Sequence, residues 1–113
     1  MTALVLPPEF AAQIEREARA VFPRECCGLI EGRRIGDRTI VTALYPVPNL
    51  SPEADRFELD PMTHLRMMRE ARETGRTIIG CYHSHPNGLA QPSARDAAGA
   101  GETDFLWLIA AVT

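Results

Sequence analysis

The first part of the chain combines a short apolar stretch with a longer helical pattern. Residues 2–6 are mostly apolar and predict a strand that two prolines end. From residue 8 to residue 21, apolar side chains recur every three or four positions, while charged side chains occupy the opposite face. The pattern predicts a helix over 8–21, and Pro23 lies beyond its end, where helix-stopping prolines are common.

Two β-forming runs follow, separated by polar residues. Residues 27–31 are typical of a short buried strand, and residues 39–45 are rich in β-forming side chains. The segment 32–37 between them is mostly polar and contains two glycines, which predicts a turn. We therefore expect these two strands to form a hairpin.

A loop and a second helix occupy the middle of the chain. Residues 46–55 contain three prolines and predict a loop, whereas residues 56–59 alternate in polarity as a strand does. Asp60, followed by a proline, predicts the N-cap of a helix that runs to about Thr74, where a glycine supplies the stop. The apolar stripe of this helix is expected to consist of Met62, Leu65, Met68 and Ala71.

The last part of the chain predicts two further strands with a helix between them. Residues 77–83 form the clearest strand pattern, which delivers a histidine to its end. A helix is expected from Ser93 to about Ala100. The continuous apolar run 105–112 predicts a central strand that is covered on both faces. Without repeats or linkers, the whole chain, 1–113, is expected to form one domain.

Composition and charge narrow the class of protein. With 45% hydrophobic and 24% charged residues, the composition is that of a soluble globular protein. The net charge of -3, without a run of basic residues, argues against general binding to nucleic acid. No apolar segment approaches the ~20 residues of a membrane span, and no signal peptide is recognisable. Three cysteines form an odd and sparse set, so we expect a reducing, cytoplasmic location. Because no segment is long and apolar enough to span a membrane, we also expect no membrane association.

The candidate chemistry lies in a pair of histidines and a downstream aspartate. His83 and His85 are two residues apart, so on a strand their rings point to the same side. Seven residues separate His85 from Ser93, and Asp96 lies three positions after Ser93; a structural interpretation explains these two as the cap and first turn of a helix. Capping and metal binding do not exclude each other. Two imidazoles and one carboxylate suit zinc, and three protein ligands leave a fourth position open for water.

The remaining candidates carry weaker local signals. Glu25, by its position alone, is typical of a solvated surface residue. Cys81 precedes His83 by two residues on the same strand face and would close the metal site as a fourth ligand. We favour an open site, because Cys81 lies a further ~6–7 Å along the strand and is expected to be a small buried hydrophobic residue. Cys26 and Cys27 are interpreted as packing residues at the entry to a strand.

These residues together resemble a known family. Glu25 followed by Cys-Cys-Gly-Leu-Ile, the segment Gly-Cys-Tyr-His83-Ser-His85-Pro, and Pro-Ser93-Ala-Arg-Asp96 are similar to the motifs of the JAMM (MPN+, JAB-domain) zinc metalloproteases, in particular the small bacterial type. The resemblance implies an α/β, cytidine-deaminase-like fold with a mixed, curved sheet flanked by helices. It implies Zn²⁺ bound by the two histidines and the aspartate, Glu25 as general acid and base, and Ser93 as a hydrogen-bond donor to the developing oxyanion.

The resemblance also implies a substrate. Members of the family hydrolyse isopeptide or peptide bonds at the C-terminus of ubiquitin or a ubiquitin-like protein. This chain lacks the long insertions of the eukaryotic members, which favours a smaller carrier, such as a sulfur-carrier protein of ubiquitin fold. Release of cysteine or another small amine from a carrier adduct is a narrower option within the same hypothesis.

Other functions remain open at this point. A metal-bearing, non-proteolytic module of the RadC type has a similar His-x-His and Ser-x-x-Asp motif, and an inactive scaffold is a third alternative. The segment around Glu25 and the intact ligand set favour the protease. The family domain usually continues through at least one more strand after the position of Thr113. We therefore expect either a shortened form or a sheet edge covered by a partner, with a homodimer as one option.

Overall fold

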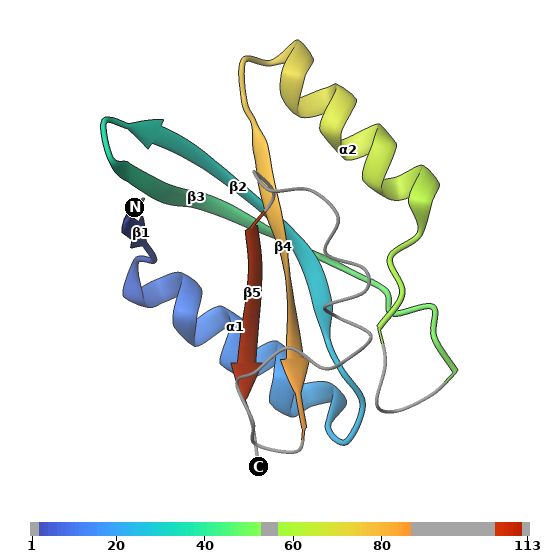
Figure 1. The fold of residues 1–113 in the computed structure, drawn as a ribbon. Helices are drawn as coiled ribbons and strands as arrows, with labels where there is room; N and C mark the ends of the chain where they lie inside the picture. Colours follow the sequence, from blue (N-terminus) through green and yellow to red (C-terminus); the bar gives the residue numbers. More distant parts are fainter. Residues whose placement is uncertain (1–2, 53–56, 87–105, 112–113) are drawn as a thin grey trace.

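The computed structural model describes residues 3–52, 57–86 and 106–111 of the chain. These residues form a curved sheet of five strands in the order β1-β3-β2-β4-β5, with a helix on each side (Figure 1). The elements are β1 (Ala3–Val5), α1 (Pro8–Val21), β2 (Cys27–Ile35), β3 (Arg38–Val47), α2 (Pro61–Glu73), β4 (Ile78–His85) and β5 (Leu106–Ala111). The sheet is mixed, since β1 runs parallel to β3 and β5 parallel to β4, whereas β2 is antiparallel to both neighbours. The predicted fold class is confirmed.

Helix α1 covers one face of the sheet, with the bounds that the sequence predicted. Its Ile14 and Ala18 are buried and pack in one cluster with strand residues that include Ile30 and Tyr82. The Tyr82 hydroxyl donates a hydrogen bond to Oε1 of Glu17 on the helix at 2.6 Å. Burial and this carboxylate raise the pKa of Tyr82 well above its ordinary value, so the phenol remains protonated as the donor.

The opposite face holds a second, smaller core in which α2 takes part. Leu29 and Cys81 lie opposite each other on β2 and β4, and they pack with Ala71 of α2. Since neighbouring residues of a strand point to opposite faces, Leu29 belongs to this core and Ile30 to the other. The two strands therefore contribute alternate residues to two cores, which fixes their register.

The stripe predicted for α2 is wrong. Met62 is 71% exposed, Leu65 59% and Met68 37%, and of the four predicted residues Ala71 is the buried one. The helix instead packs through Met67 and Ala71, which are four residues apart and share a narrow face. Periodicity identified the helix, but it could not tell which of two partly apolar faces meets the sheet.

The ends of α2 are as predicted. The Asp60 side chain accepts a hydrogen bond from the backbone N–H of Met62 at 3.2 Å, as an N-cap does. At the other end, Gly75 has a φ of 73° and donates to the carbonyl of Arg72. The N–H of Arg76 also donates a hydrogen bond to a carbonyl of the last turn. Together, the two hydrogen bonds form a Schellman motif. No helix within the described ranges is both long and apolar enough to span a membrane.

Three predictions about strands need correction. The predicted turn at 32–37 is shorter, because β2 continues to Ile35 and pairs with β3 up to a tight turn at Gly36, where φ is 62°. The described part of 56–59, residues 57–59, is not a strand. The apolar strand predicted to be central is β5, which lies at an edge of the described sheet. The helix predicted from Ser93 lies outside the described residues.

Gly80 allows β4 and β5 to approach closely, which generates a first prediction. A Cβ at this position would lie 2.3 Å from the backbone carbonyl oxygen of Leu106 on β5. We expect Gly80→Ala to lower the free energy of unfolding by about 1–3 kcal/mol, since backbone must move to accept the methyl group. Denaturant unfolding monitored by circular dichroism measures the change. Gly36→Asn is the control, because nothing lies within 4 Å of a Cβ there and asparagine tolerates positive φ. Equal losses in both variants would contradict the close contact.

Candidate metal centre

His83 and His85 lie side by side at the C-terminal end of β4. Both are buried, and their Nε2 atoms are 3.1 Å apart. This confirms the geometry that the two-residue spacing predicted for a strand. The strand is longer than predicted and carries both histidines, so both rings are fixed by the sheet.

Glu25 joins the histidines, although it lies 58 residues before His83 in the chain. One ligand atom from each of the three side chains lies within 4.8 Å of the other two. The surface position that its local sequence suggested is wrong, because Glu25 is only 5% exposed. The register explains the meeting: Cys27 pairs with His83 in the antiparallel β2–β4 ladder, so the residue two positions earlier reaches the level of His85.

Ser84 connects the two segments at this point. Its Oγ accepts a hydrogen bond from the backbone N–H of Cys26 at 2.9 Å, and its own N–H donates to the carbonyl of Cys26 at 3.1 Å. Ser84 is fully buried. The residue between the histidines therefore holds the residue next to Glu25. The sequence contained no local signal for this role, since a serine between two histidines is equally compatible with exposure.

Aromatic rings surround His83. Phe57 stacks on its imidazole with ring centroids 4.2 Å apart and an angle of 20°, and Trp107 meets it edge-on at 6.0 Å. Phe57 and Trp107 also contact each other edge to face at 5.8 Å. These contacts restrict the orientation of the imidazole and exclude water from its faces. Neither residue was predicted to lie at the site, because they come from a segment before α2 and from β5.

The cysteines do not provide an alternative centre among the described residues. Cys26, Cys27 and Cys81 are buried and none forms a disulfide. Burial raises the pKa of the Cys27 thiol from 9.0 to about 12, and it also raises that of Cys26. Cys81 packs in the core with Leu29, as expected for a small hydrophobic residue. The thiols of Cys26 and Cys27 are therefore protonated at neutral pH and unsuited to act as nucleophiles.

The described donor set fits zinc. Two imidazole nitrogens and a carboxylate are ligand types that zinc accepts. Tetrahedral bonds of about 2.0–2.1 Å place two ligand nitrogens about 3.3–3.4 Å apart, close to the spacing of the two Nε2 atoms. Glu25 supplies a carboxylate beside them. The other two predicted site residues, Ser93 and Asp96, lie outside the described residues, so the third predicted ligand is not placed.

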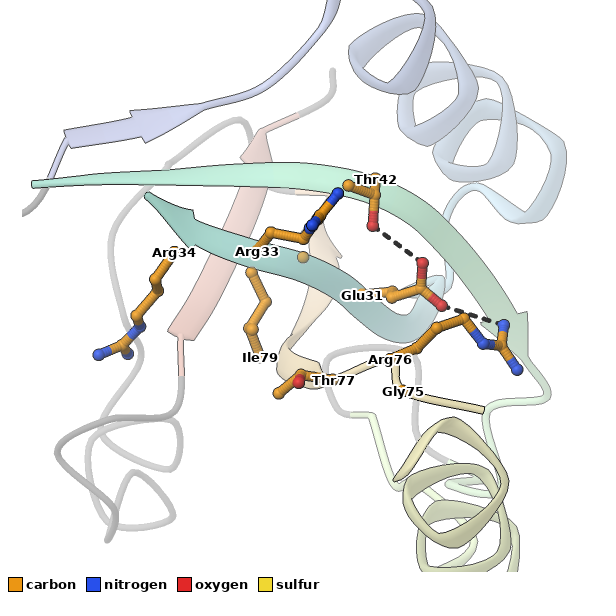
Figure 2. Close-up of a pocket in the computed structure, with 9 residues that line it drawn as sticks. Glu31, Arg33, Arg34, Thr42, Gly75, Arg76, Thr77 and Ile79 are labelled. Carbon is orange, nitrogen blue, oxygen red and sulfur yellow. Dashed lines mark hydrogen bonds and ion pairs between the residues drawn. The ribbon is translucent and has the colours of Figure 1, made fainter. Parts of the chain in front are cut away.

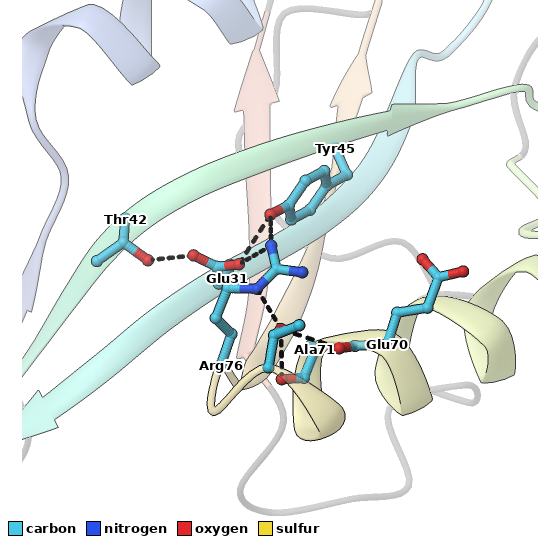
Figure 3. Close-up of polar contacts among 7 residues, drawn as sticks. Glu31, Thr42, Tyr45, Glu70, Ala71 and Arg76 are labelled. Carbon is cyan, nitrogen blue, oxygen red and sulfur yellow. Dashed lines mark hydrogen bonds and ion pairs between the residues drawn. The ribbon is translucent and has the colours of Figure 1, made fainter.

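A second polar cluster lies at the other end of the sheet (Figure 3). The buried carboxylate of Glu31 accepts hydrogen bonds from Thr42 at 2.9 Å, Tyr45 at 2.8 Å and Arg76 at 3.1 Å. An adjoining cavity of about 720 Å³ is lined by residues of β2, β3 and the α2–β4 connection (Figure 2). The ion pair between Glu31 and Arg76 ties β2 to the α2–β4 connection. The cavity lies at the far end of β4 from His85, so the cluster is separate from the metal centre.

Comparisons with known proteins show which proteins the chain is similar to. Residues 7–113 match the family described as prokaryotic homologs of the JAB domain. The chain is 35% identical over 88 residues to a desampylase of Haloferax volcanii, which covers 77% of this chain and 62% of that protein. It is 37% identical over 89 residues to a probable TtuB-protein conjugate cleaving protease of Thermus thermophilus, with coverage of 78% and 54%.

A solved structure supports the fold. The chain is similar to a protein of Desulfitobacterium hafniense determined in solution, with a TM-score of 0.79 and 35% identity, over 96% of this chain and 73% of that one. The matches to the two enzymes cover less than two thirds of their own length. The comparisons therefore establish a family rather than a substrate.

The contact of Ser84 with the backbone of Cys26 generates a second prediction. Ser84→Ala leaves the buried N–H of Cys26 without its acceptor, so we expect the free energy of unfolding to fall by about 1–3 kcal/mol. Thr63→Ala removes a less buried hydroxyl contact, to Asp60, and should cost less than about 1 kcal/mol. Urea unfolding of both variants checks the difference, and an unchanged stability of Ser84→Ala would contradict the assigned contact.

The buried cysteines generate a third prediction. Because the folded chain raises the pKa of the Cys27 thiol to about 12, the thiol stays protonated until well above its ordinary pKa of 9.0. Unfolding is therefore favoured as the pH rises from 9.0, since the unfolded thiol then loses its proton first. At pH of about 8, a thiol reagent such as DTNB should react slowly with native protein and rapidly with all three cysteines in guanidinium. Rapid reaction of the native protein would show that these thiols are accessible.

Proposed function

The chain belongs to the family of prokaryotic homologues of the JAB domain, and from this premise we propose that it is a zinc-dependent peptidase or isopeptidase. Its substrate is an amide bond at the C-terminus of a ubiquitin-like or sulfur-carrier protein. The names of the two similar enzymes, a desampylase and a probable TtuB-protein conjugate cleaving protease, support this substrate class. The observation that carries the proposal is the buried cluster of Glu25, His83 and His85.

The zinc ligands are His83, His85 and Asp96. The imidazole pair supports this assignment, because its Nε2 atoms are 3.1 Å apart, close to the spacing of two nitrogens on tetrahedral zinc. The bound ion supplies a Lewis acid that acidifies water and polarises the scissile carbonyl. Three protein ligands leave room for the substrate, which distinguishes a catalytic site from a closed structural one.

Glu25 is the general acid and base of the reaction. A carboxylate oxygen accepts a proton from the attacking water as the new C–O bond forms at the carbonyl carbon. The same group then returns this proton to the nitrogen of the leaving amine as the C–N bond breaks. Ser93 donates a hydrogen bond to the oxygen on which negative charge develops. The position of the buried Glu25 carboxylate beside the two histidines supports this role, because a general base must lie within reach of the water at the metal.

The partner is a small protein of ubiquitin fold, and the compartment is the cytoplasm. The three cysteines form no disulfide, which supports a reducing environment. The small carrier is supported by the similarity to enzymes that are named for such conjugates. The reaction releases the carrier with a free C-terminal carboxylate and the target with a free amine.

A fourth prediction separates the acid/base role from metal binding. Glu25→Gln keeps the shape of the side chain but removes its proton-accepting oxygen, so turnover of a carrier conjugate should fall by about 10²–10⁴ while zinc is retained. His83→Ala should lose both zinc and turnover. Gel-based cleavage of C-terminally conjugated ubiquitin-like carriers, combined with elemental analysis of the purified variants, measures both quantities.

A chelator provides the control for the metal. Wild-type activity should disappear on chelation and return on addition of Zn²⁺. Full activity of Glu25→Gln would remove Glu25 from the mechanism. Cleavage that survives chelation and the loss of His83 would contradict the proposed function itself.

A further inference from the structure

Asn49 lies where three segments of the chain meet. Its Nδ2 donates a hydrogen bond to the carbonyl oxygen of Glu25 at 3.0 Å. Its Oδ1 accepts from the backbone N–H of Ser51 at 2.9 Å and of Glu58 at 3.0 Å. One side-chain amide therefore connects the segment that precedes β2, the loop after β3 and the segment that leads to α2.

The first of these contacts acts on the backbone that carries Glu25. The carbonyl of Glu25 and the N–H of Cys26 belong to one planar peptide group. The N–H side is bound by Oγ of Ser84, and the carbonyl side by Nδ2 of Asn49. Rotation of this peptide group would break at least one of the two hydrogen bonds. Since the peptide group is attached directly to Cα of Glu25, its orientation determines where the carboxylate can reach.

The loop after β3 and the segment before β2 exchange hydrogen bonds, with donors on both segments. Arg24 donates from its guanidinium to the backbone carbonyls of Ser51 and Pro52. Asn49 donates in the opposite direction, from the loop to the carbonyl of Glu25. These contacts bring together residues that are more than 20 positions apart and make the loop a support for the segment rather than a separate feature.

The same amide also reaches the aromatic contact of His83. Glu58, whose N–H donates to Asn49, accepts in turn from the N–H of Leu50 at 3.0 Å. Glu58 directly follows Phe57, whose ring stacks on His83 at 4.2 Å. Asn49 is thereby linked to the backbone of the residue that carries the carboxylate and, through Glu58 and Phe57, to one of the imidazoles.

We propose that Asn49 is a positioning residue for the reaction: its amide orients the Glu25–Cys26 peptide group and so places the Glu25 carboxylate against His83 and His85. The inference rests on the proposed acid/base role of Glu25. The three hydrogen bonds of Asn49 described above all join it to backbone groups. Its effect on turnover is transmitted through the backbone of Glu25.

Asn49→Asp isolates the contact that matters. The substitution is isosteric and keeps an oxygen acceptor for the N–H groups of Ser51 and Glu58, so the turn within the loop is retained. The donor to Glu25 is replaced by a second oxygen, which faces a carbonyl oxygen and repels it. Asn49→Ala removes all three contacts, and a comparison of the two variants separates positioning of Glu25 from general support of the loop.

The experiment uses the full chain loaded with Zn²⁺ and the carrier conjugate that the wild type cleaves. In Asn49→Asp we expect kcat to fall about 10- to 100-fold, because a displacement of about 1 Å of a reacting group can cost about 100-fold. KM should stay within about twofold, since the substrate contacts are unchanged. Zinc content should equal that of the wild type. Leu50→Asp introduces the same charge at the neighbouring exposed position and should change kcat by less than about twofold.

A second readout does not depend on activity. In ¹⁵N NMR spectra of Asn49→Asp, the amide resonance of Cys26 should shift, because its peptide group has lost the donor on the carbonyl side. The amides of Ser51 and Glu58 should retain slow hydrogen exchange, which only Asn49→Ala should abolish. In a crystal structure of Asn49→Asp, the Glu25 carboxylate should lie farther from the two histidines than in the wild type.

Three results would overturn the inference. They are a wild-type kcat in Asn49→Asp, an unmoved Cys26 resonance, and a fall in kcat that is matched by an equal loss of zinc. A wild type that cleaves no carrier conjugate would instead contradict the proposed function. In that case the Cys26 resonance and the position of the Glu25 carboxylate still decide whether Asn49 orients this peptide group.

Discussion

The site depends on the antiparallel pairing of β2 with β4, which the backbone N–H and carbonyl of Cys26 continue beyond the start of β2. Cys27 lies opposite His83, and the N–H and carbonyl of Cys26 both bond to Ser84. Glu25 therefore reaches the histidines although they are about 60 positions later in the chain. A shift of this register by one residue would turn the histidines to the other face of the sheet and separate them from the carboxylate. The geometry of the Glu25, His83 and His85 cluster and the strand register are thus one constraint.

The two cores hold that register in place. Ile30 and Tyr82 contribute to the core under α1, whereas Leu29 and Cys81 contribute to the core under α2. Both strands are consequently buried on both faces, and slippage would bury the wrong side chains on each. His83, on whose imidazole Phe57 stacks, is fully buried by the same packing. Stability and the geometry of the proposed site therefore rest on the same packed strands, whereas the Glu31 cluster lies at the far end of β4.

Local patterns predicted local features correctly. Helix α1, the caps of α2, the β2–β3 hairpin and the meeting of His83 with His85 follow from spacing and turn chemistry over a few residues. Features that depend on distant contacts were not predictable in this way. The local sequence of Glu25 suggested exposure, whereas in the fold Glu25 is buried and the pairing of β2 with β4 brings it beside the histidines. The predicted packing face of α2 and the predicted central position of the 105–112 strand were also wrong, since periodicity records that a segment is apolar but not which neighbour covers it.

The account makes one central claim, that Glu25, His83 and His85 form a single centre for a hydrolytic zinc ion. A crystal structure of the zinc-loaded protein, with the ion located by its anomalous signal, tests it most directly. We predict one ion bonded to Nε2 of both histidines, oxygen but no sulfur among its other ligands, and the Glu25 carboxylate beside the open coordination position. An ion bound through a cysteine, or bound to the histidines with Glu25 turned away from it, would contradict the claim.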